Sequence, residues 1–332
     1  MKTRRRWIIL MSLVLFSMMF YLFFWMLTTP YDLFPSDPVR AEKMREAIFN
    51  IISRRSIQML AMIISAILIS STSLVFQTMT QNRILTPSLI GFDAIFISVQ
   101  TTIVFFLSSS SIFFVNPYLN FLVSAGLMIV VSLALYRLIL KKNKNNIIFL
   151  LLVGMVLSTL SRSFASFLQT VMDPDEFQSL TIRTEVSITN MNLSIIWLAL
   201  PLMIIIIYLL MKDYREYDVM TLGEHNAIGL GVRYAKKMNT SLIYMALAMS
   251  ISTALIGPIS FLGLISVNAA REMLKDYKHL PLFLASSMIT VIFLVLGQGI
   301  IAETGYLTTV TVLISMVGGI YMIYLILKEN KA

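Results

Sequence analysis

The side chains of this chain that could do chemistry are few and widely separated. His225 and His279 are the only histidines, neither lies in an HExxH pattern, and cysteine is absent. Zinc proteases need paired histidines, and thiolate metal sites and cysteine nucleophiles need cysteine. The sequence also contains no GxxxxGK(S/T) and no GxSxG pattern. We therefore expect no catalytic residue, no metal site and no ATP-binding site in this chain.

Two charged residues stand inside long apolar segments. Arg162 lies near the middle of segment 147–171, and Asp93 lies near the start of segment 88–107. A charge at the centre of a bilayer costs about 2.5–3.5 kcal/mol on insertion scales, so Arg162 should face protein or water. It could be the partner of a polar neighbour such as Asp93, it could line a pathway and attract an anionic substrate, or the boundary of the span could lie elsewhere. An ion-driven carrier would need more buried acids or histidines, so we expect the energy source to lie outside this chain.

The composition shows what must position these residues. Of the 332 residues, 58% are apolar and 13% are charged, and the mean hydropathy is +0.83. A soluble protein this apolar would expose large apolar patches, and it would normally carry roughly 25% charged residues. We predict one transmembrane domain, residues 1–332, in an all-α integral membrane protein. Since about 20 apolar residues cross a bilayer, ten spans are expected: 7–27, 57–79, 88–107, 118–139, 147–171, 192–211, 239–256, 258–274, 280–300 and 307–327.

The basic residues orient these spans. Ten spans place both termini on one side, and assigning that side to the cytoplasm puts most of the 26 Lys and Arg residues in inner segments. This distribution agrees with the positive-inside rule. The net charge of +9 then reflects cytoplasmic loops in contact with lipid, and no nucleic-acid partner is expected. We predict a multi-pass protein of a bacterial cell membrane (plasma or inner membrane).

One outer segment departs from the positive-inside rule. Residues 40–55 mix basic and acidic side chains with apolar ones in a pattern typical of an amphipathic helix at the outer surface. Arg54 and Arg55 stand directly at the entrance to the second span. Outward-facing arginines at that place suit the docking of an acidic partner.

The cytoplasmic stretch 221–238 reads TLGEHNAIGLGVRYAKKM. Gly223 and Gly231 permit sharp changes of chain direction, and apolar residues lie between them. The pattern predicts two short helical turns that form a rigid knob for the groove of a partner. An ordinary connection between two spans is the alternative.

Four blocks of the sequence resemble the FecCD-type permeases, the membrane subunits of ABC importers for ferric siderophores, haem and cobalamin. Residues 222–232 have the pattern LGExxAxxLGV and resemble the family's coupling helices. Residues 77–91 resemble QxxxRNPLAxPxxxG, and residues 257–271 resemble GPIxFxGLxxPHxxR. Residues 55–58 resemble RLPR, with Arg55 at the first arginine. The blocks occur in the family's order, and the resemblance runs from about residue 50 to 327.

The matching positions in the second and third blocks are Gln77, Asn82, Pro87, Gly91, Gly257, Pro258, Gly263 and Arg271. Several positions depart from the family pattern. Gln81 and Arg83 replace the usual Arg and Pro, Asn268 replaces the usual His, and Gln58 replaces the second outer arginine. These departures indicate a divergent member of the family.

The resemblance implies an assembly around this chain. Two permease subunits would form one pore, two ATPase subunits would bind the coupling helices, and an extracytoplasmic binding protein would deliver the substrate. ATP and Mg would be held by the ATPase, with no cofactor on this chain. The divergent motifs lean towards two unlike permeases, and a homodimer stays open. The expected substrate is a ferric siderophore; the alternatives are cobalamin, haem or, less favoured, an ion-coupled secondary carrier.

The resemblance also implies roles for individual residues. The ATPase-coupling residues would be Leu222, Gly223, Glu224, Ala227, Leu230, Gly231 and Val232, and the docking residues for the binding protein would be Arg54 and Arg55. The fifth and tenth spans would line the pathway, with Arg162 on the fifth. Asn145 and Asn146 would sit at the inner gate. Residues 173–180 resemble the outer gate helix and carry Asp173, Asp175 and Glu176.

Overall fold

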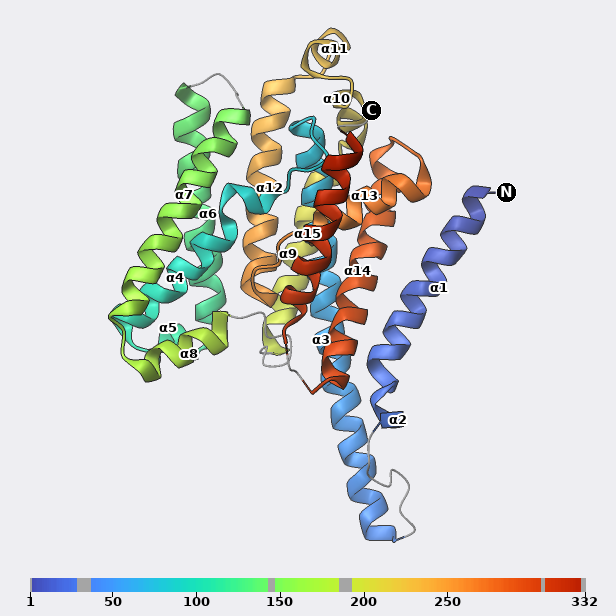
Figure 1. Cartoon of the computed structure of the whole chain (residues 1–332), viewed down its shortest axis with the longest axis vertical. Coiled ribbons are helices and arrows are strands. Elements are labelled where there is room, and N and C mark those ends of the chain that lie inside the picture. The colour runs from blue at the N-terminus through green and yellow to red at the C-terminus, as the bar shows by residue number, and fades with distance from the viewer. Residues whose placement is uncertain (1, 29–36, 143–146, 185–192, 306–307, 330–332) are drawn as a thin grey trace.

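The computed structural model describes residues 2–28, 37–142, 147–184, 193–305 and 308–329, and every regular element within these ranges is a helix (Figure 1). Ten helices correspond to the ten predicted spans: α1 (Lys2–Phe23), α3 (Pro38–Met79), α4 (Phe92–Leu107), α6 (Pro117–Lys142), α7 (Ile147–Thr170), α9 (Ile196–Met211), α12 (Tyr234–Ile256), α13 (Leu262–Leu274), α14 (His279–Glu303) and α15 (Val310–Glu329). The prediction of an all-α membrane protein is confirmed.

Shorter helices lie between the spans. They are α2 (Trp25–Thr28), η1 (Pro87–Ile90), α5 (Ile112–Val115), α8 (Pro174–Thr184), η2 (Leu193–Ile195), α10 (Tyr214–Met220) and α11 (Glu224–Gly229). Within the described ranges six helices are long and apolar enough to cross a bilayer unaided, and α9 with α10 makes a seventh if its 49° bend is accepted within one span. Of the other spans, α4 and α13 are shorter helices, so part of the length of these two spans is completed by irregular chain.

The irregular chain occurs at specific backbone breaks. Gly91 has φ 101° and separates η1 from α4, which is 16 residues long. Gly257 has φ 85° and Phe261 has φ 63°, and together they separate α12 from the 13-residue α13. Glycine adopts such φ values without strain, whereas Phe261 does so at a steric cost. Irregular backbone of this kind is tolerated at membrane depth only where protein covers it or water reaches it.

The centre of the bundle is formed by the inner half of α3. From Ala61 to Met79 most of its side chains are buried, including the polar run Ser70–Ser73. These hydroxyls bond back to carbonyls one turn earlier, as Ser71 does to Ile67 (2.6 Å) and Thr72 to Leu68 (2.8 Å). Such local bonds satisfy the hydroxyls inside the apolar interior. The small side chains then allow other helices to approach α3 closely.

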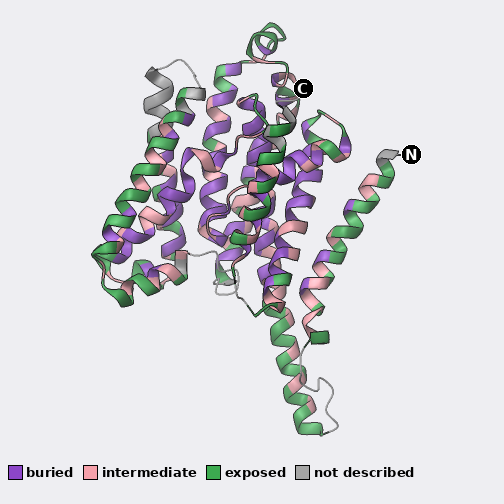
Figure 2. Cartoon of the chain, in the orientation of Figure 1, coloured by how far each residue is buried: buried purple, intermediate pink, exposed green. Residues whose placement is uncertain are grey.

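Burial divides the bundle into inner and outer helices (Figure 2). The membrane-spanning part of α3, together with α12 and α14, is mostly buried inside the bundle, while α1, α7 and α15 carry long exposed faces of apolar residues. In a membrane protein such faces meet lipid or another subunit. The first residues of α1, the last of α15 and helix α11 lie at the same end of the bundle (Figure 1). This agrees with the predicted topology of both termini on one side.

The outer segment 40–55 is helical, as its pattern predicts, but it is not a separate helix. It continues the second span without a break, so α3 runs for 42 residues, or about 63 Å at 1.5 Å per residue. Asp37 caps its start by accepting a hydrogen bond from the Val39 amide (3.1 Å), and Pro38 occupies the first turn. We refer to residues 38–55 as the outer extension of α3. In Figure 1 it projects beyond the rest of the bundle, at the end opposite to α11.

Candidate functional site

The predicted coupling segment forms a compact turn of helix at the cytoplasmic end of the molecule. Gly223 and Gly231 bound it with φ 89° and 87°. The amide of Val232 donates to the carbonyl of Ala227 (3.0 Å), and Ala227 is completely buried under the segment. Glu224, another of the predicted coupling residues, is exposed in the first turn of α11. One short helix, α11, therefore lies between the two glycines, where the sequence predicted two short helical turns, and the coupling role of the segment stays a prediction.

The tip of this segment carries an apolar edge. Leu222, Ile228 and Leu230 are exposed by 55%, 53% and 64%. Ile228 lies on α11 and the two leucines flank this helix, which projects furthest from the bundle at this end (Figure 1). Apolar side chains so exposed outside the membrane are typical of a surface that another protein covers. Among the predicted coupling residues, Leu222 and Leu230 are therefore placed for contact, whereas Ala227 and the two glycines shape the turn.

Helix α10, which leads into this segment, is attached to α12 by polar side chains. Lys237 of α12 lies 3.0 Å from Asp213 and 3.3 Å from Glu216, and its ammonium group stands 4.6 Å from the centre of the Tyr217 ring. The Tyr217 hydroxyl is 2.7 Å from that of Ser241. The Lys237 side chain is only 9% exposed, and a buried charge is costly unless it is paired, so the two carboxylates compensate the burial of the ammonium group.

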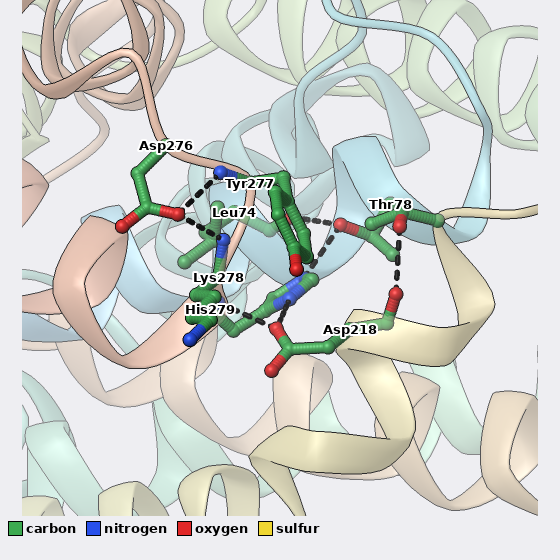
Figure 3. A network of polar contacts seen from close by, with 8 residues as sticks. Leu74, Thr78, Asp218, Asp276, Tyr277, Lys278 and His279 are labelled. Carbon is green, nitrogen blue, oxygen red and sulfur yellow. Dashed lines mark hydrogen bonds and ion pairs between the residues drawn. The ribbon is translucent and has the colours of Figure 1, made fainter.

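A second polar network attaches α10 to α3 and α14 (Figure 3). Asp218 accepts a hydrogen bond from the His279 amide (2.6 Å), and the same oxygen is 2.8 Å from Nδ1 of the His279 ring. Nε2 of His279 is 2.8 Å from the hydroxyl of Thr78, in the last turn of α3. Burial raises the pKa of the Asp218 carboxyl, but the hydrogen bonds with His279 outweigh burial and hold that pKa below its usual value.

The second and third motif blocks meet at the loop after α3. The carbonyl of Arg83 accepts hydrogen bonds from the side chains of Gln77 (2.9 Å) and Asn268 (2.9 Å). Asn82 accepts from the Ile84 amide through its side chain (2.8 Å) and thereby turns the chain towards Pro87, the first residue of η1. The amide at position 268 therefore closes the loop where the family has histidine.

Close helix contacts explain several motif glycines. A Cβ atom on Gly263 would overlap the side chain of Ser73, so α13 can lie against α3 only with glycine there. A Cβ on Gly91 would approach Ser158 to 3.2 Å, and its φ of 101° favours glycine as well. These residues act in packing. Gly257 and Pro258 lie at the break before α13, and Arg271 lies on α13 as a half-buried residue with its Nε bonded to no described atom.

Arg162 is exposed on α7, and its charge acts on Asp93 at the first turn of α4. Asp93 is 4% exposed and accepts a hydrogen bond from the Ser260 hydroxyl (2.9 Å), while its other oxygen has no hydrogen-bond partner among the described residues. The two predicted roles of Arg162, as a partner of Asp93 and as a charge along a pathway, are therefore compatible. Its charge acts on the Asp93 carboxylate, and its side chain is also exposed on the surface of this subunit.

The predicted gate helix is α8, Pro174–Thr184, which is longer than the expected 173–180. Asp173 accepts from the Asp175 amide (3.0 Å), and both acids are exposed. Glu176 instead points back to the end of α4, where it accepts from the Ser108 hydroxyl (2.7 Å) and the Ser109 amide (2.6 Å). These hydrogen bonds lower the pKa of the Glu176 carboxyl.

The two predicted docking arginines have different environments. Arg54 is exposed on the outer extension, whereas the Arg55 side chain is 15% exposed. Arg55 donates to the carbonyl of Tyr21 (2.6 Å) and faces Glu303. The inner-gate residues Asn145 and Asn146 lie outside the described residues.

Comparison with known proteins identifies the family. The sequence profile of the FecCD transport family matches residues 9–328. The chain belongs to the FecCD transport family. It is therefore a transport permease and not an enzyme, and the resemblance inferred from the four sequence blocks is confirmed. As a permease of an ABC importer, it works with ATPase subunits, a second permease subunit and a binding protein.

Two curated permeases and one solved structure show how far the similarity of this FecCD permease extends. It is 42% identical over 280 residues to the petrobactin import system permease protein YclO of Bacillus subtilis (strain 168), covering 84% of this chain and 89% of that protein. It is 28% identical to the petrobactin import system permease protein FatC of Bacillus anthracis, with 99% and 90% covered. A transporter described as of the metal-chelate ABC type, in an inward-facing conformation, matches with TM-score 0.79 at 19% identity, covering 98% and 99%. This last similarity bears on the fold.

Sequence reasoning on this FecCD permease missed three polar partners. Asp218 and His279 are 61 residues apart, and Arg55 and Glu303 lie on spans that are distant in the chain. Ser260 stands inside the GPISF block, yet its hydrogen bond to Asp93 joins residues 167 positions apart. No local sequence pattern predicts such pairs, because they form only when the spans pack against each other.

Proposed function

We propose that this FecCD permease carries a ferric siderophore across a bacterial cell membrane as part of an ATP-driven importer. The observation that carries the proposal is the glycine-bounded turn at 222–232, whose exposed leucines form an apolar tip at the cytoplasmic end. The relatives support the substrate class, since the two compared above are permeases of petrobactin import systems. Petrobactin loaded with iron is therefore the first substrate to test.

The energy source in this proposal is a separate ATPase. Its grooves would receive Leu222, Ile228 and Leu230, which would bury their exposed apolar surface on contact. ATP and Mg would stay on that subunit. Closure of the ATPase dimer would pull or tilt the turn, and Gly223 and Gly231 would keep it a compact unit during the movement.

The pathway would lie beside the exposed faces of α7 and α15, where a second permease subunit would complete it. Both helices carry large exposed apolar side chains, for example Leu160 (65%) on α7 and Met316 (66%) on α15. Arg162 would supply a positive charge along the α7 side and favour an anionic chelate. The unlike motifs of this chain suit pairing with a different permease, and the same surfaces would serve a homodimer.

The outer surface would receive the binding protein. Arg54 and the exposed residues of the outer extension would make contact with acidic groups on that protein, and Arg55 would fix the base of the extension. Helix α8 would act as the outer gate, with Asp175 exposed on it and Asp173 exposed directly before it. Cobalamin or haem would use the same machinery, and these are the alternative substrates.

Co-purification and uptake together test this proposal. The Leu230→Asp variant places a charge on the apolar tip, and His225→Ala alters an exposed polar residue on the same helix as the control. We expect Leu230→Asp to lose both the bound ATPase and the uptake of iron-loaded petrobactin, while His225→Ala keeps both. Full uptake by Leu230→Asp with no ATPase attached would overturn the ATP-driven mechanism and favour an ion-coupled carrier.

A further inference from the structure

Helices α3 and α14 are joined by polar contacts at three levels. At the cytoplasmic end Thr78 lies 2.8 Å from Nε2 of His279, and in the middle the hydroxyls of Ser70 and Ser287 are 2.9 Å apart. At the outer end Arg55 and Glu303 face each other at 4.0 Å. Outside these pairs the two helices pack through apolar side chains along their length.

The register of these contacts shows that the two helices run side by side without slipping. From the cytoplasmic to the middle contact the chain advances eight residues on each helix, 78 to 70 and 279 to 287. From the middle to the outer contact it advances fifteen residues on α3 and sixteen on α14. Each step covers the same length on both partners, because both helices rise about 1.5 Å per residue. A tilt of one helix is therefore shared by the other.

The cytoplasmic end of this pair is attached directly to the helix that leads into the coupling turn. Asp218 of α10 holds the first residue of α14 through both the backbone amide and the ring of His279 (2.6 and 2.8 Å). A second side chain reinforces this connection: Nε2 of Gln81 donates to the carbonyls of Thr78 and Met220, both at 2.8 Å. Figure 3 shows Asp218, His279 and Thr78 meeting at one point.

The outer end of the pair leads directly to the outer extension. Helix α3 continues past Arg55 without a break in its backbone, so residues 38–55 and the buried part of α3 are one helix. A rotation of this helix at its cytoplasmic end therefore moves the extension on the other side of the membrane. Packed helices shift between discrete arrangements and do not bend continuously, which suits the transmission of a two-state movement.

We propose that α3 and α14 form one lever, that the Asp218–His279–Thr78 contact fixes this lever to the coupling segment, and that the lever carries the ATP-driven movement to the outer extension. His279 and Asp218 are thus positioning residues for transport. The inference rests on the proposed function, since it needs an ATPase at the coupling turn. It assigns a task to the outer extension: the surface that meets the binding protein moves together with the site that meets the ATPase.

The absence of cysteine from this chain makes the movement measurable. In the assembled importer, spin labels on Glu46→Cys in the outer extension and Ile112→Cys on α5 report the distance between the lever and a helix outside it; both positions are exposed. In the parent complex we expect this distance to change when ATP is added and hydrolysis is blocked. A parent complex that takes up no iron chelate and binds no ATPase would refute the proposed function itself.

Three variants then test the lever. Thr78→Val removes the hydrogen bond between α3 and His279, and His279→Ala removes the ring contacts with both Thr78 and Asp218. Tyr217→Phe is the control, because it removes only the hydroxyl of α10 that faces Ser241 on α12. We expect the first two to keep the bound ATPase and to hydrolyse ATP, to lose the change in distance, and to import at least about fivefold less substrate per ATP hydrolysed. Tyr217→Phe should behave as the parent protein.

Rescue separates a mechanical role from a purely structural one. His279→Asn retains a side-chain amide that can donate to Asp218, and it should restore part of the lost coupling where His279→Ala does not. If Thr78→Val and His279→Ala assemble, keep the change in distance and import normally per ATP, the lever is refuted. If these variants fail to assemble, the same spin labels in the Ser70→Ala and Ser287→Ala variants test the middle contact. An unchanged change in distance together with unchanged import per ATP in these variants would likewise refute the lever.

Discussion

Arg55 and Glu303 face each other at the outer ends of α3 and α14, with 4.0 Å between Nη2 and Oε1. Their side chains are only 15% and 17% exposed. The Arg55 guanidinium also lies 5.3 Å from the centre of the Tyr21 ring and donates to the Tyr21 carbonyl. This arginine therefore ties α1, α3 and α14 together, in addition to any contact with a binding protein.

This arrangement predicts that the two neighbouring arginines differ in their effect on stability. Arg55→Ala removes the guanidinium that faces the largely buried Glu303 carboxylate and leaves that carboxylate with the Thr28 hydroxyl (2.6 Å), so we expect the free energy of unfolding to fall by about 1–3 kcal/mol. Arg54→Ala should change it by less than about 0.5 kcal/mol, because Arg54 is exposed. Thermal denaturation of the purified protein in detergent measures both. Arg54→Ala should instead weaken binding of the binding protein, and equal loss of stability in the two variants would contradict this division.

Arg162 is predicted to raise the transport of anionic chelates through its charge. Arg162→Gln should raise the substrate concentration needed for half-maximal uptake in proteoliposomes, and Arg162→Lys should retain most of the parent behaviour. Thr159→Val is the matched control, since Thr159 is exposed one turn earlier on α7 and its hydroxyl bonds to its own helix. The difference between parent and Arg162→Gln should shrink as salt rises, because salt screens charges. If the difference between the parent and Arg162→Gln does not change with ionic strength, Arg162 acts through packing and its charge is not needed for transport.

The hydrogen bonds of Glu176 with Ser108 and Ser109 predict that the attachment of α8 to the end of α4 depends on pH. The pKa of the Glu176 carboxyl is lowered from 4.5 by hydrogen bonds from Ser108 and Ser109, so the contact is fully formed above pH 4.5 and is lost as the pH falls through the lowered value. A spin label on Gln178→Cys should therefore become mobile only in acid. Glu176→Gln weakens the contact at every pH, and the label should be mobile even at neutral pH. A label whose mobility is the same in the parent and in Glu176→Gln would contradict this account.

Glycine packing predicts a contrast between two substitutions in the membrane. Gly263→Ala places a methyl group against Ser73 and forces α13 away from α3, so we expect a loss of about 1–3 kcal/mol. Gly126→Ala adds the same methyl group to α6, where no atom of the described residues lies within 4 Å of it, and it should be neutral or slightly stabilising. Thermal denaturation in the same detergent compares the two. Equal melting temperatures would show that α13 can move without cost.

The sequence predicted the order of the ten helices that correspond to the proposed spans, because each of them is a local run of apolar residues. It also predicted the glycine-bounded turn, since Gly223 and Gly231 mark its ends and leucines lie between them. What it did not predict are features set by packing. The outer segment was expected as a surface helix, but nothing in its residues interrupts the helix between Pro38 and Met79, and the two became one element.

The candidate site was predictable only in part for the same reason. Motif residues such as Gln77 and Gly263 were found through the resemblance to the FecCD family, and the structure gives them roles in closing a loop and in helix contact. The placement of Arg55 in an internal contact depends on Glu303 at the far end of the chain. Likewise, His279 stood out only as an isolated histidine, because its partners Asp218 and Thr78 come from other helices.

The energy source of uptake tests the central claim most directly. The complete complex, with its binding protein, would be reconstituted in proteoliposomes, and import of radioactive iron bound to petrobactin would be followed with and without ATP. We predict import only with ATP on the side of the coupling turn, and its loss in Leu230→Asp. Import driven by an ion gradient in the absence of ATP would contradict the account.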